Sequence, residues 1–516
     1  MNAALSTSTS LYRFVLYFAG AESKLGRELE SSYRLCAVVG YNKVINKLLF
    51  NHLAVVREYT IPSYHPRIYH SMRCEAQTMP SRKTVISASS GLWMKSLKHL
   101  VVFSSLCCLI SGYSERERVH DLMSRYPLID GHNDLALQLR ILHNNQLSQI
   151  DLYNVSKVAT DITRLQAGHV QAQMFAVYVL CGAQEKDAVR LTLEQIDVVR
   201  RMCTEYQDFE LVTSAQELRN SEMKHKIACL ISIEGGHSID SSLPALRMFY
   251  QLGVRSMTLT HTCNTPWAES SSKIYNIYQR QNNSLTHFGK AVVEEMNRLG
   301  MIVDLSHTSW DTAWAALKHS KAPVIFSHSS SFSICSHGRN VPDWLLHDLK
   351  KKQGLIMVNL HSKFISCSDE ANISRVADHF DHIKNVIGAE SIGIGGDFEG
   401  AVSFPQGLED VSKYPALIQE LLQRNWTENE LADVLRRNFL RVFEEVERVR
   451  DRLSLNRPSE VQISVKEVQN PCRLVLRPPD PRRPSDMSPS SRAQNGPKGL
   501  LILVIPLMLS SLLMIE

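Results

Sequence analysis

The chain has little excess charge and no concentrated basic region. Its formal net charge is +5 over 516 residues, and residues 1–93 alone hold 11 Lys and Arg against 5 Asp and Glu. The remaining residues therefore lie close to neutrality. Because a nucleic-acid-binding surface needs clustered cations to neutralise phosphates, we expect no nucleic-acid partner.

Two common site patterns are also missing. The 11 cysteines contain no pair of CxxC motifs, which argues against a zinc ribbon. No glycine-rich fingerprint follows the first predicted strand, which argues against a dinucleotide-binding open sheet. The hydrophobic fraction of 44% and the charged fraction of 21% are ordinary for a globular protein. The length suffices for at least one large core.

Features typical of a secreted protein are present instead. N-x-S/T glycosylation sequons begin at Asn154, Asn282, Asn372 and Asn425. The cysteines in the body of the chain are spread out, at Cys181, Cys203, Cys229, Cys263, Cys335, Cys367 and Cys472. Together with the targeting signals below, these features predict an oxidising compartment in which some of the cysteines are paired.

The segment 94–113 has the pattern of a signal peptide. Lys95 and Lys98 precede an apolar stretch, Leu100–Ile110, that is followed by small residues. Because this segment begins as late as Met94, we expect residues 1–93 to be an extension that the mature protein lacks. The alternative is an uncleaved signal-anchor.

The last part of the chain predicts a lipid anchor. Residues 456–498 form a polar, proline-rich segment, and residues 499–516 are apolar up to the final Glu516. Such a tail is typical of a GPI-attachment signal, with Ser488 or Ser491 as the attachment site. A short transmembrane helix is the alternative, but Pro506 and the lack of a basic flank weigh against it. We therefore expect a secretory route to the extracellular face of the plasma membrane.

Short apolar runs alternate with helical stretches between Tyr126 and Arg450. The apolar runs are Leu128–His132, Met174–Leu180, Ala228–Glu234, Ser256–His261, Met301–His307, Pro323–His328, Leu355–Leu360 and Ser391–Asp397. Helix periodicity is clear in Leu191–Tyr206 and Leu285–Leu299. Apolar strands that alternate with helices indicate a parallel sheet. Eight of them predict a closed (β/α)₈ TIM barrel within residues 115–455, with a doubly wound open sheet as the alternative.

Polar side chains at the ends of these runs suggest a metal site. His132 and Asp134 are two positions apart, so they point the same way on an extended backbone. Glu234 follows a fully apolar run, where an unpaired carboxylate would be costly. His307 and His328 end two successive strands. Each residue alone also fits an ordinary turn or core position, but together they are the ligand types that zinc prefers.

The number of these side chains predicts two zinc ions. Five ligands exceed what one tetrahedral zinc accepts. Two ions about 3.5–4 Å apart, bridged by one carboxylate, would use all five. We expect Glu234 to bridge, with His132 and Asp134 on one ion and His307 and His328 on the other.

Three further residues would complete a hydrolytic site. His261 ends the fourth predicted strand, and Asp397 ends the eighth after two glycines. Arg339 follows the sixth strand and could bind a carboxylate through two hydrogen bonds. A surface ion pair is the alternative for Arg339.

Several motifs in this region resemble those of one enzyme family. DGHNDL, IEGGHSIDSSL, LTLTHTCNTPWAES, DLSH, PVIFSHSS, RNVPD and GGDFEG occur in this order between Glu115 and Cys472. They resemble the renal or membrane dipeptidases (the M19 peptidases), in particular the branch that hydrolyses leukotriene D4. The family fold is a TIM barrel of the metal-dependent amidohydrolase type with two zinc ions.

The resemblance implies roles for individual residues. It places the zinc ligands at His132, Asp134, Glu234 (bridging), His307 and His328, substrate binding at His261 and Arg339, and the catalytic acid/base at Asp397. It implies the disulfides Cys181–Cys263 and Cys335–Cys367, and a homodimer linked through Cys472. The family often has Asp where this chain has Glu399, from which we expect an indirect effect at most.

The implied function is zinc-dependent hydrolysis of dipeptides by a zinc-bridging hydroxide. Expected substrates include leukotriene D4, which would give leukotriene E4, as well as cystinyl-bis-glycine and some β-lactams. A deaminase or phosphotriesterase would share the barrel, but those enzymes usually have HxH on the first strand. A non-enzymatic adhesion or receptor barrel is the other alternative, and the complete ligand set argues against it.

Overall fold

The computed structural model describes residues 115–468, apart from 273, 275–276 and 279–283, and also residues 470 and 474. The chain divides into two compact units, Met1–Val468 and Gln469–Glu516, and the fold below belongs to the first. Several predicted features lie outside the described residues: the extension 1–93, the signal peptide 94–113, Asn282, Cys472, Ser488, Ser491 and the apolar tail 499–516.

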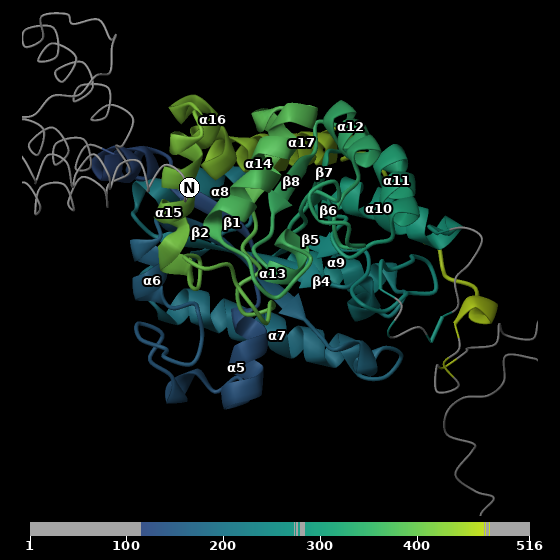
Figure 1. Cartoon of the computed structure of the whole chain (residues 1–516). Coiled ribbons are helices and arrows are strands. Elements are labelled where there is room, and N and C mark those ends of the chain that lie inside the picture. The colour runs from purple at the N-terminus through teal and green to yellow at the C-terminus, as the bar shows by residue number, and fades with distance from the viewer. Residues whose placement is uncertain are drawn as a thin grey trace, which may run out of the picture. The chain divides into compact units, whose positions relative to one another are not determined.

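A closed barrel of eight parallel strands forms the centre of the first unit (Figure 1). In the order in which they pair around the barrel, the strands are β1 Leu128–Asn133, β2 Val170–Tyr178, β4 Ile227–Glu234, β5 Val254–Thr258, β6 Ile302–Asp304, β7 Val324–Phe326, β8 Leu355–Val358 and β9 Ile392–Ile394. Pairing of β2 with β4 and of β1 with β9 closes the ring. This closed ring confirms the predicted barrel and excludes the open sheet.

One short strand was not predicted. β3, Phe209–Leu211, pairs in parallel with the first residues of β4, outside the closed ring. Its three residues are too few to produce a recognisable alternation in the sequence.

Helices cover the outside and one end of the barrel. They are α5 Leu135–His143, α6 Ile162–Ala167, α7 Ala188–Glu205, α8 Ala215–Met223, α9 Leu243–Gln251, α10 His287–Leu299, α11 Trp310–His319, α12 Asp343–Lys351, α13 Ser362–Ile365, α14 Ile373–Ile387, α15 Tyr414–Gln423, α16 Glu428–Ala432 and α17 Asn438–Arg452. Short 3₁₀ turns are Leu147–Gln149, Cys181–Ala183, Gly236–Ile239, Ala389–Ser391, Val411–Lys413 and Val465–Glu467, and a π-helical turn, Asp433–Arg437, precedes α17.

Local sequence fixes the ends of these helices. The Thr286 side chain accepts a hydrogen bond from the Gly289 amide and so caps the start of α10. Gly300 ends this helix in the left-handed region at φ +79°, which costs glycine little. Both helices predicted from periodicity are present, as α7 and α10.

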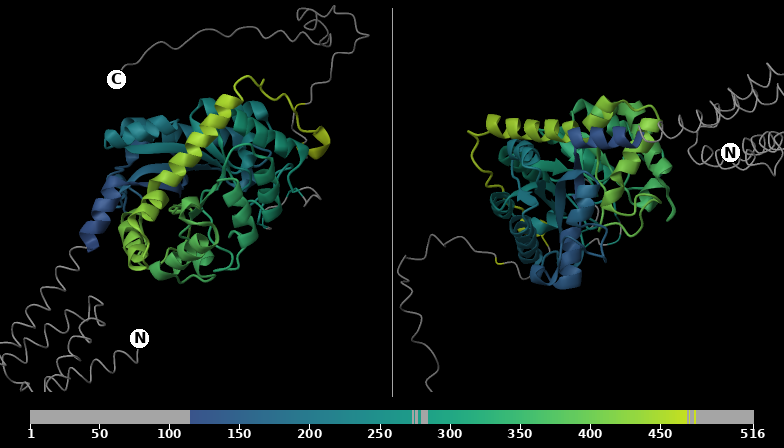
Figure 2. Two further views of the ribbon diagram at one scale, coloured as in Figure 1. Left: turned by 90° about the horizontal axis from the view of Figure 1, so that it is seen from above. Right: turned by 90° about the vertical axis from the view of Figure 1, so that its left-hand side faces the viewer.

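The long helix α17 closes the barrel end where the strands begin. Its apolar residues, including Phe439 and Phe443, cluster with Ile129, Ala172 and Leu230 from the first halves of β1, β2 and β4. This helix runs diagonally across the molecule in yellow-green (Figure 2). The opposite end, where the strands finish, is therefore left for polar side chains.

Two disulfides join loops beyond the strand ends, and a third joins a helix to a strand. Cys181–Cys263 and Cys335–Cys367 are both present, as the family resemblance implies. A third bond, Cys203–Cys229, was not predicted and links α7 to β4.

The sequon asparagines among the described residues, Asn154, Asn372 and Asn425, are all exposed. In the described part of the chain, every helix is too short or too polar to cross a bilayer.

Candidate metal centre

The strand ends bring the five proposed metal ligands to one place. His132 lies in β1, Asp134 is the first residue after this strand, and Glu234 is the last residue of β4. His307 and His328 follow β6 and β7. Four of these side chains are at most 4% exposed, and that of His307 is 11% exposed. Carboxyl ends of parallel strands open onto the same barrel mouth, so residues far apart in the sequence become neighbours.

Glu234 is at the centre of this group. Its Oε1 atom lies 2.9 Å from His307 Nε2, 3.4 Å from His328 Nε2 and 3.5 Å from His132 Nε2. A fourth imidazole, that of His261, places its Nε2 3.7 Å from the same oxygen. One carboxylate oxygen thus faces four ring nitrogens.

The remaining contacts divide the ligands into two pairs. His132 Nε2 lies 3.1 Å from Asp134 Oδ2, and His307 Nε2 lies 2.8 Å from His328 Nε2. The second carboxylate oxygen, Asp134 Oδ1, is buried without a hydrogen-bond partner among the described residues. A buried carboxylate oxygen without a partner fits a metal ligand. Two ring nitrogens that face each other fit a pair of imidazoles that would share one cation.

The electrostatics of the group also favour a cation. Burial alone would lower the pKa of His132, but the charges of Glu234 and Asp134 outweigh it and raise this pKa to about 10. Burial, together with nearby cationic groups, lowers the pKa of His307 and His328 well below the usual value. These two imidazoles are therefore neutral at pH 7, as metal ligands must be, whereas His132 carries a proton that a bound cation would displace.

Asp397 stands beside this group, in the loop after β9. One of its carboxylate oxygens lies close to ligand atoms of His132 and Asp134, and Oδ2 accepts a hydrogen bond from Asn359 at 3.4 Å. Burial is the main reason why its pKa is raised to about 7.

Two residues of the site have an unusual backbone. Asp397 has φ +58° and His307 has φ +67°, both in the left-handed region. Such conformations in non-glycine residues are concentrated at functional sites.

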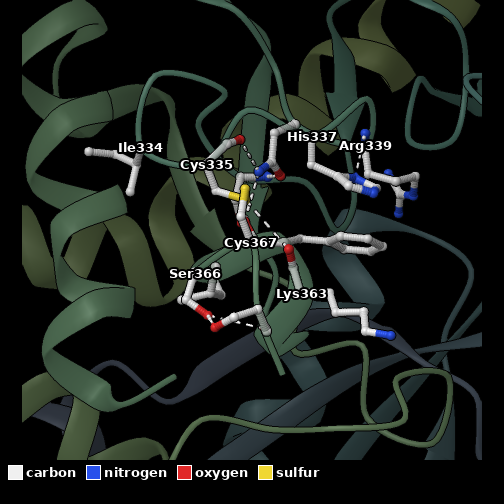
Figure 3. The surroundings of a disulfide bond; sticks show 12 residues. Ile334, Cys335, His337, Arg339, Lys363, Ser366 and Cys367 are labelled. Atoms are coloured by element: carbon white, nitrogen blue, oxygen red, sulfur yellow. Dashed lines mark hydrogen bonds between the residues drawn. A yellow bond between two sulfur atoms is a disulfide. The ribbon is translucent and has the colours of Figure 1, made fainter. Parts of the chain in front are cut away.

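Arg339 approaches the same group from the loop after β7. Its guanidinium donates to Ser329 Oγ at 3.2 Å and to the His328 carbonyl at 3.1 Å. The Phe364 ring lies 5.3 Å from the guanidinium carbon. The Cys335–Cys367 disulfide lies in the same loop region, and Figure 3 shows Arg339 and His337 to one side of it. Arg339 is thus a half-buried cation beside the proposed metal site, not a surface ion pair.

Two buried aspartates complete the site, and sequence reasoning missed both. Asp130 Oδ1 accepts the Gly396 amide at 2.9 Å, and Tyr414 donates its hydroxyl to Asp130 Oδ2 at 2.6 Å. Asp304 Oδ1 accepts the amides of Ser306 and Ser327, both at 3.0 Å. Each aspartate ties one strand end to its neighbour. Their position two or three residues before a ligand histidine was the available signal.

Glu399 lies outside the ligand group. Its side chain bonds to Thr160, and burial is the main reason why its pKa is raised to about 7. The predicted indirect effect of this residue stays a prediction.

The closed parallel barrel and the cluster of histidines and carboxylates at its mouth define a class: a metal-dependent hydrolase of the amidohydrolase type. Residues 116–457 match the family described as membrane dipeptidase (peptidase family M19), and the chain belongs to this family.

Known relatives agree with this assignment. The chain is 53% identical over 363 residues to dipeptidase 3 of Mus musculus, which covers 70% of this chain and 73% of the relative. It is 40% identical over 355 residues to dipeptidase aclJ of Aspergillus oryzae, with coverage of 66% and 83%. Among solved structures, the metallopeptidase dipeptidase AC superposes with a TM-score of 0.58 at 25% identity, over 62% of this chain and 98% of that one. The protein is therefore a metallo-dipeptidase by family, and the names of these relatives do not point to the leukotriene D4 branch.

Proposed function

We propose that the protein hydrolyses dipeptides with two zinc ions bridged by Glu234, and that its substrates include cysteinyl-glycine conjugates such as leukotriene D4. The observation behind this proposal is the convergence of four imidazole nitrogens on one oxygen of Glu234, at 2.9–3.7 Å. No single ion pair would need so many imidazoles, whereas a pair of cations bridged by Glu234 would take three of them as ligands and leave His261 for the substrate.

The two ligand pairs suggest how the ions are shared. His132 and Asp134 would hold one ion, and His307 and His328 the other. When bound, the two zinc ions supply a water activated at neutral pH and polarise the scissile carbonyl.

The other residues of the mouth would bind and orient the substrate. Arg339 would bind the terminal carboxylate of the dipeptide, which limits the substrate to two residues. His261 faces Glu234 and stacks on His307 with ring centroids 4.2 Å apart, so it would hydrogen-bond the developing oxyanion. Asp397 would pass a proton to the leaving amine, because it stands beside the ligand group on its own loop.

The proposed cellular setting is the outer face of the plasma membrane, with a GPI anchor and a homodimer linked through Cys472. Phosphatidylinositol-specific phospholipase C should then release the protein from cells, and retention would favour a transmembrane tail. Non-reducing electrophoresis should show a dimer that Cys472→Ser converts to a monomer.

Glu234→Gln is the variant that tests the catalytic proposal. The purified variant should lose bound zinc and nearly all turnover of glycine-containing dipeptides, because an amide cannot bridge two cations. Glu295→Gln is a matched control, since Glu295 is equally buried but pairs with Arg247 and Arg298. This control should lose stability but keep its zinc. Full activity of Glu234→Gln would refute the proposed metal site. If the wild-type protein hydrolyses dipeptides but not leukotriene D4, only the proposal of that substrate is refuted.

A further inference from the structure

A chain of hydrogen bonds runs from Asp304 through Ser327 to His328. The Ser327 hydroxyl lies 2.8 Å from His328 Nδ1. On its other side, the same hydroxyl hydrogen-bonds the Asp304 carboxylate. All three residues are at most 1% exposed, so water does not compete for these bonds.

Backbone contacts fix the geometry of this chain. Asp304 Oδ1 accepts the amide of Ser327 itself at 3.0 Å, which ties the end of β7 to the end of β6. The His328 amide donates to Ser306 Oγ at 3.1 Å. Hydrogen bonds from their backbone amides therefore fix Ser327 and His328, in addition to the bonds of their side chains.

The order of donors and acceptors decides which nitrogen of His328 is free. A carboxylate only accepts and is a stronger acceptor than the Ser306 hydroxyl 3.5 Å away, so the single hydroxyl proton of Ser327 points to Asp304. The Ser327 oxygen then accepts from His328 Nδ1–H. A neutral imidazole protonated at Nδ1 has its lone pair on Nε2, and this nitrogen faces Glu234 Oε1 at 3.4 Å.

We propose that Asp304 and Ser327 are positioning residues that hold His328 in the tautomer and orientation required for binding the metal. This inference rests on the proposed role of His328 as a zinc ligand. Outer partners of this kind typically change metal affinity by about 10–100-fold.

Zinc affinity of the purified full-length chain, measured by competition with a chromophoric chelator, tests the inference. Ser327→Ala should bind zinc about 10–100-fold more weakly than wild type. Asp304→Asn keeps an oxygen for the two backbone amides but removes the charge that draws the Ser327 proton, so its affinity should fall about tenfold or more. The melting temperature of each metal-free variant checks that the barrel is still folded.

Two further variants separate this role from a merely structural one. If Asp304 acts through Ser327, the double variant Asp304→Asn/Ser327→Ala should bind zinc no more weakly than Ser327→Ala alone. Ser256→Ala is the matched control, because this equally buried barrel serine donates its hydroxyl to the Ile302 carbonyl instead of bonding the His328 ring. Its zinc affinity should stay near that of wild type.

The outcomes distinguish the two proposals. Failure of the wild-type chain to bind zinc would overturn the proposed function together with this inference. Normal zinc binding by wild type and equally tight binding by Ser327→Ala would overturn the inference alone. Additive losses in the double variant would show that Asp304 does not act through Ser327, and would also overturn it.

Discussion

Arg339 is suited to a planar anion because its guanidinium is held by Ser329 and the His328 carbonyl. Its Nε atom has no partner among the described residues, and the bonds to Ser329, His307 and the His328 carbonyl leave two of the five guanidinium donors for a ligand. Arg339→Lys would keep the charge but lose the two-pronged geometry. We expect the KM for a dipeptide to rise about tenfold or more, with a smaller change in kcat.

The C-terminal amide of the same dipeptide is the internal control for Arg339. Because the amide lacks the carboxylate, its KM should already be high in wild type and should hardly change in the variant. An equal rise in KM for both substrates would mean that Arg339 does not bind the carboxylate.

His379 makes stability depend on pH. Its Nδ1 accepts the Ser331 amide at 3.0 Å, and its Nε2 bonds the Ile365 carbonyl at 2.8 Å. Burial lowers the pKa of His379 to about 4. Since the unfolded state binds the proton more readily, stability falls as the pH drops from about 6.5 to about 4, by up to about 1.4 kcal/mol per pH unit.

Urea unfolding of wild type and His379→Gln over this pH range measures the effect. Glutamine can make both hydrogen bonds without binding a proton, so the slope of stability against pH should become shallower. The other histidines are common to both proteins and cancel in the difference. Identical slopes would contradict the assignment.

The sequence located seven of the eight central residues of the site because each lies at or just after the end of an apolar strand, whereas Arg339 depended on the family resemblance. Glu234 and His328 are polar residues at the end of buried runs, where a paired group or a metal ion must compensate their burial. Ser327 and Asp304 were missed because serine and aspartate are frequent in loops for many reasons. Only the structure shows that the Ser327 hydroxyl lies 2.8 Å from His328 Nδ1 and also bonds Asp304.

At the level of elements, the apolar runs predicted all eight barrel strands but placed several ends too late. The run Ser256–His261 corresponds to β5, Val254–Thr258, and Met301–His307 corresponds to β6, Ile302–Asp304. In both cases the last residues leave the sheet to direct a side chain into the site. The pattern of apolar residues cannot show where such a strand ends, because the run continues for several residues after the chain has left the sheet.

The Cys335–Cys367 disulfide holds the loop of Arg339 against α13. Asn340 Nδ2 reinforces this contact by donating to the carbonyls of Cys335 and Phe364, at 2.9 and 2.7 Å. Cys335→Ala/Cys367→Ala should therefore raise the KM for dipeptides severalfold, because the loop can then move. Steady-state kinetics of the purified variant measures this change.

Cys203→Ala/Cys229→Ala is the matched control for this pair. The two disulfides span 26 and 32 residues, so each should stabilise the fold by a similar amount, about 3–4 kcal/mol. The control bond joins α7 to β4, away from Arg339. Equal changes in KM for both variants would mean that the effect is a general loss of stability.

At the level of the whole molecule, the proposed ligands are spread around the barrel. They come from β1, β4, β6 and β7, so bound ions would link strands on opposite sides of the ring. Helix α17 already closes the other end with apolar contacts. The barrel would thus be held at one end by packing and at the other by metal.

Zinc should consequently stabilise the whole barrel. A ligand at about a thousand times its dissociation constant adds about 4 kcal/mol to the folded state. In a domain of this size, that corresponds to a rise in Tm of roughly 5–10 °C. Thermal unfolding of the chelator-treated chain, with and without added zinc at one scan rate, measures this shift. Glu234→Gln should lose most of the shift, whereas Glu295→Gln should melt earlier but keep it. A full shift in Glu234→Gln would place the stabilising zinc elsewhere on the molecule, because the ions that link the strands need the bridging carboxylate.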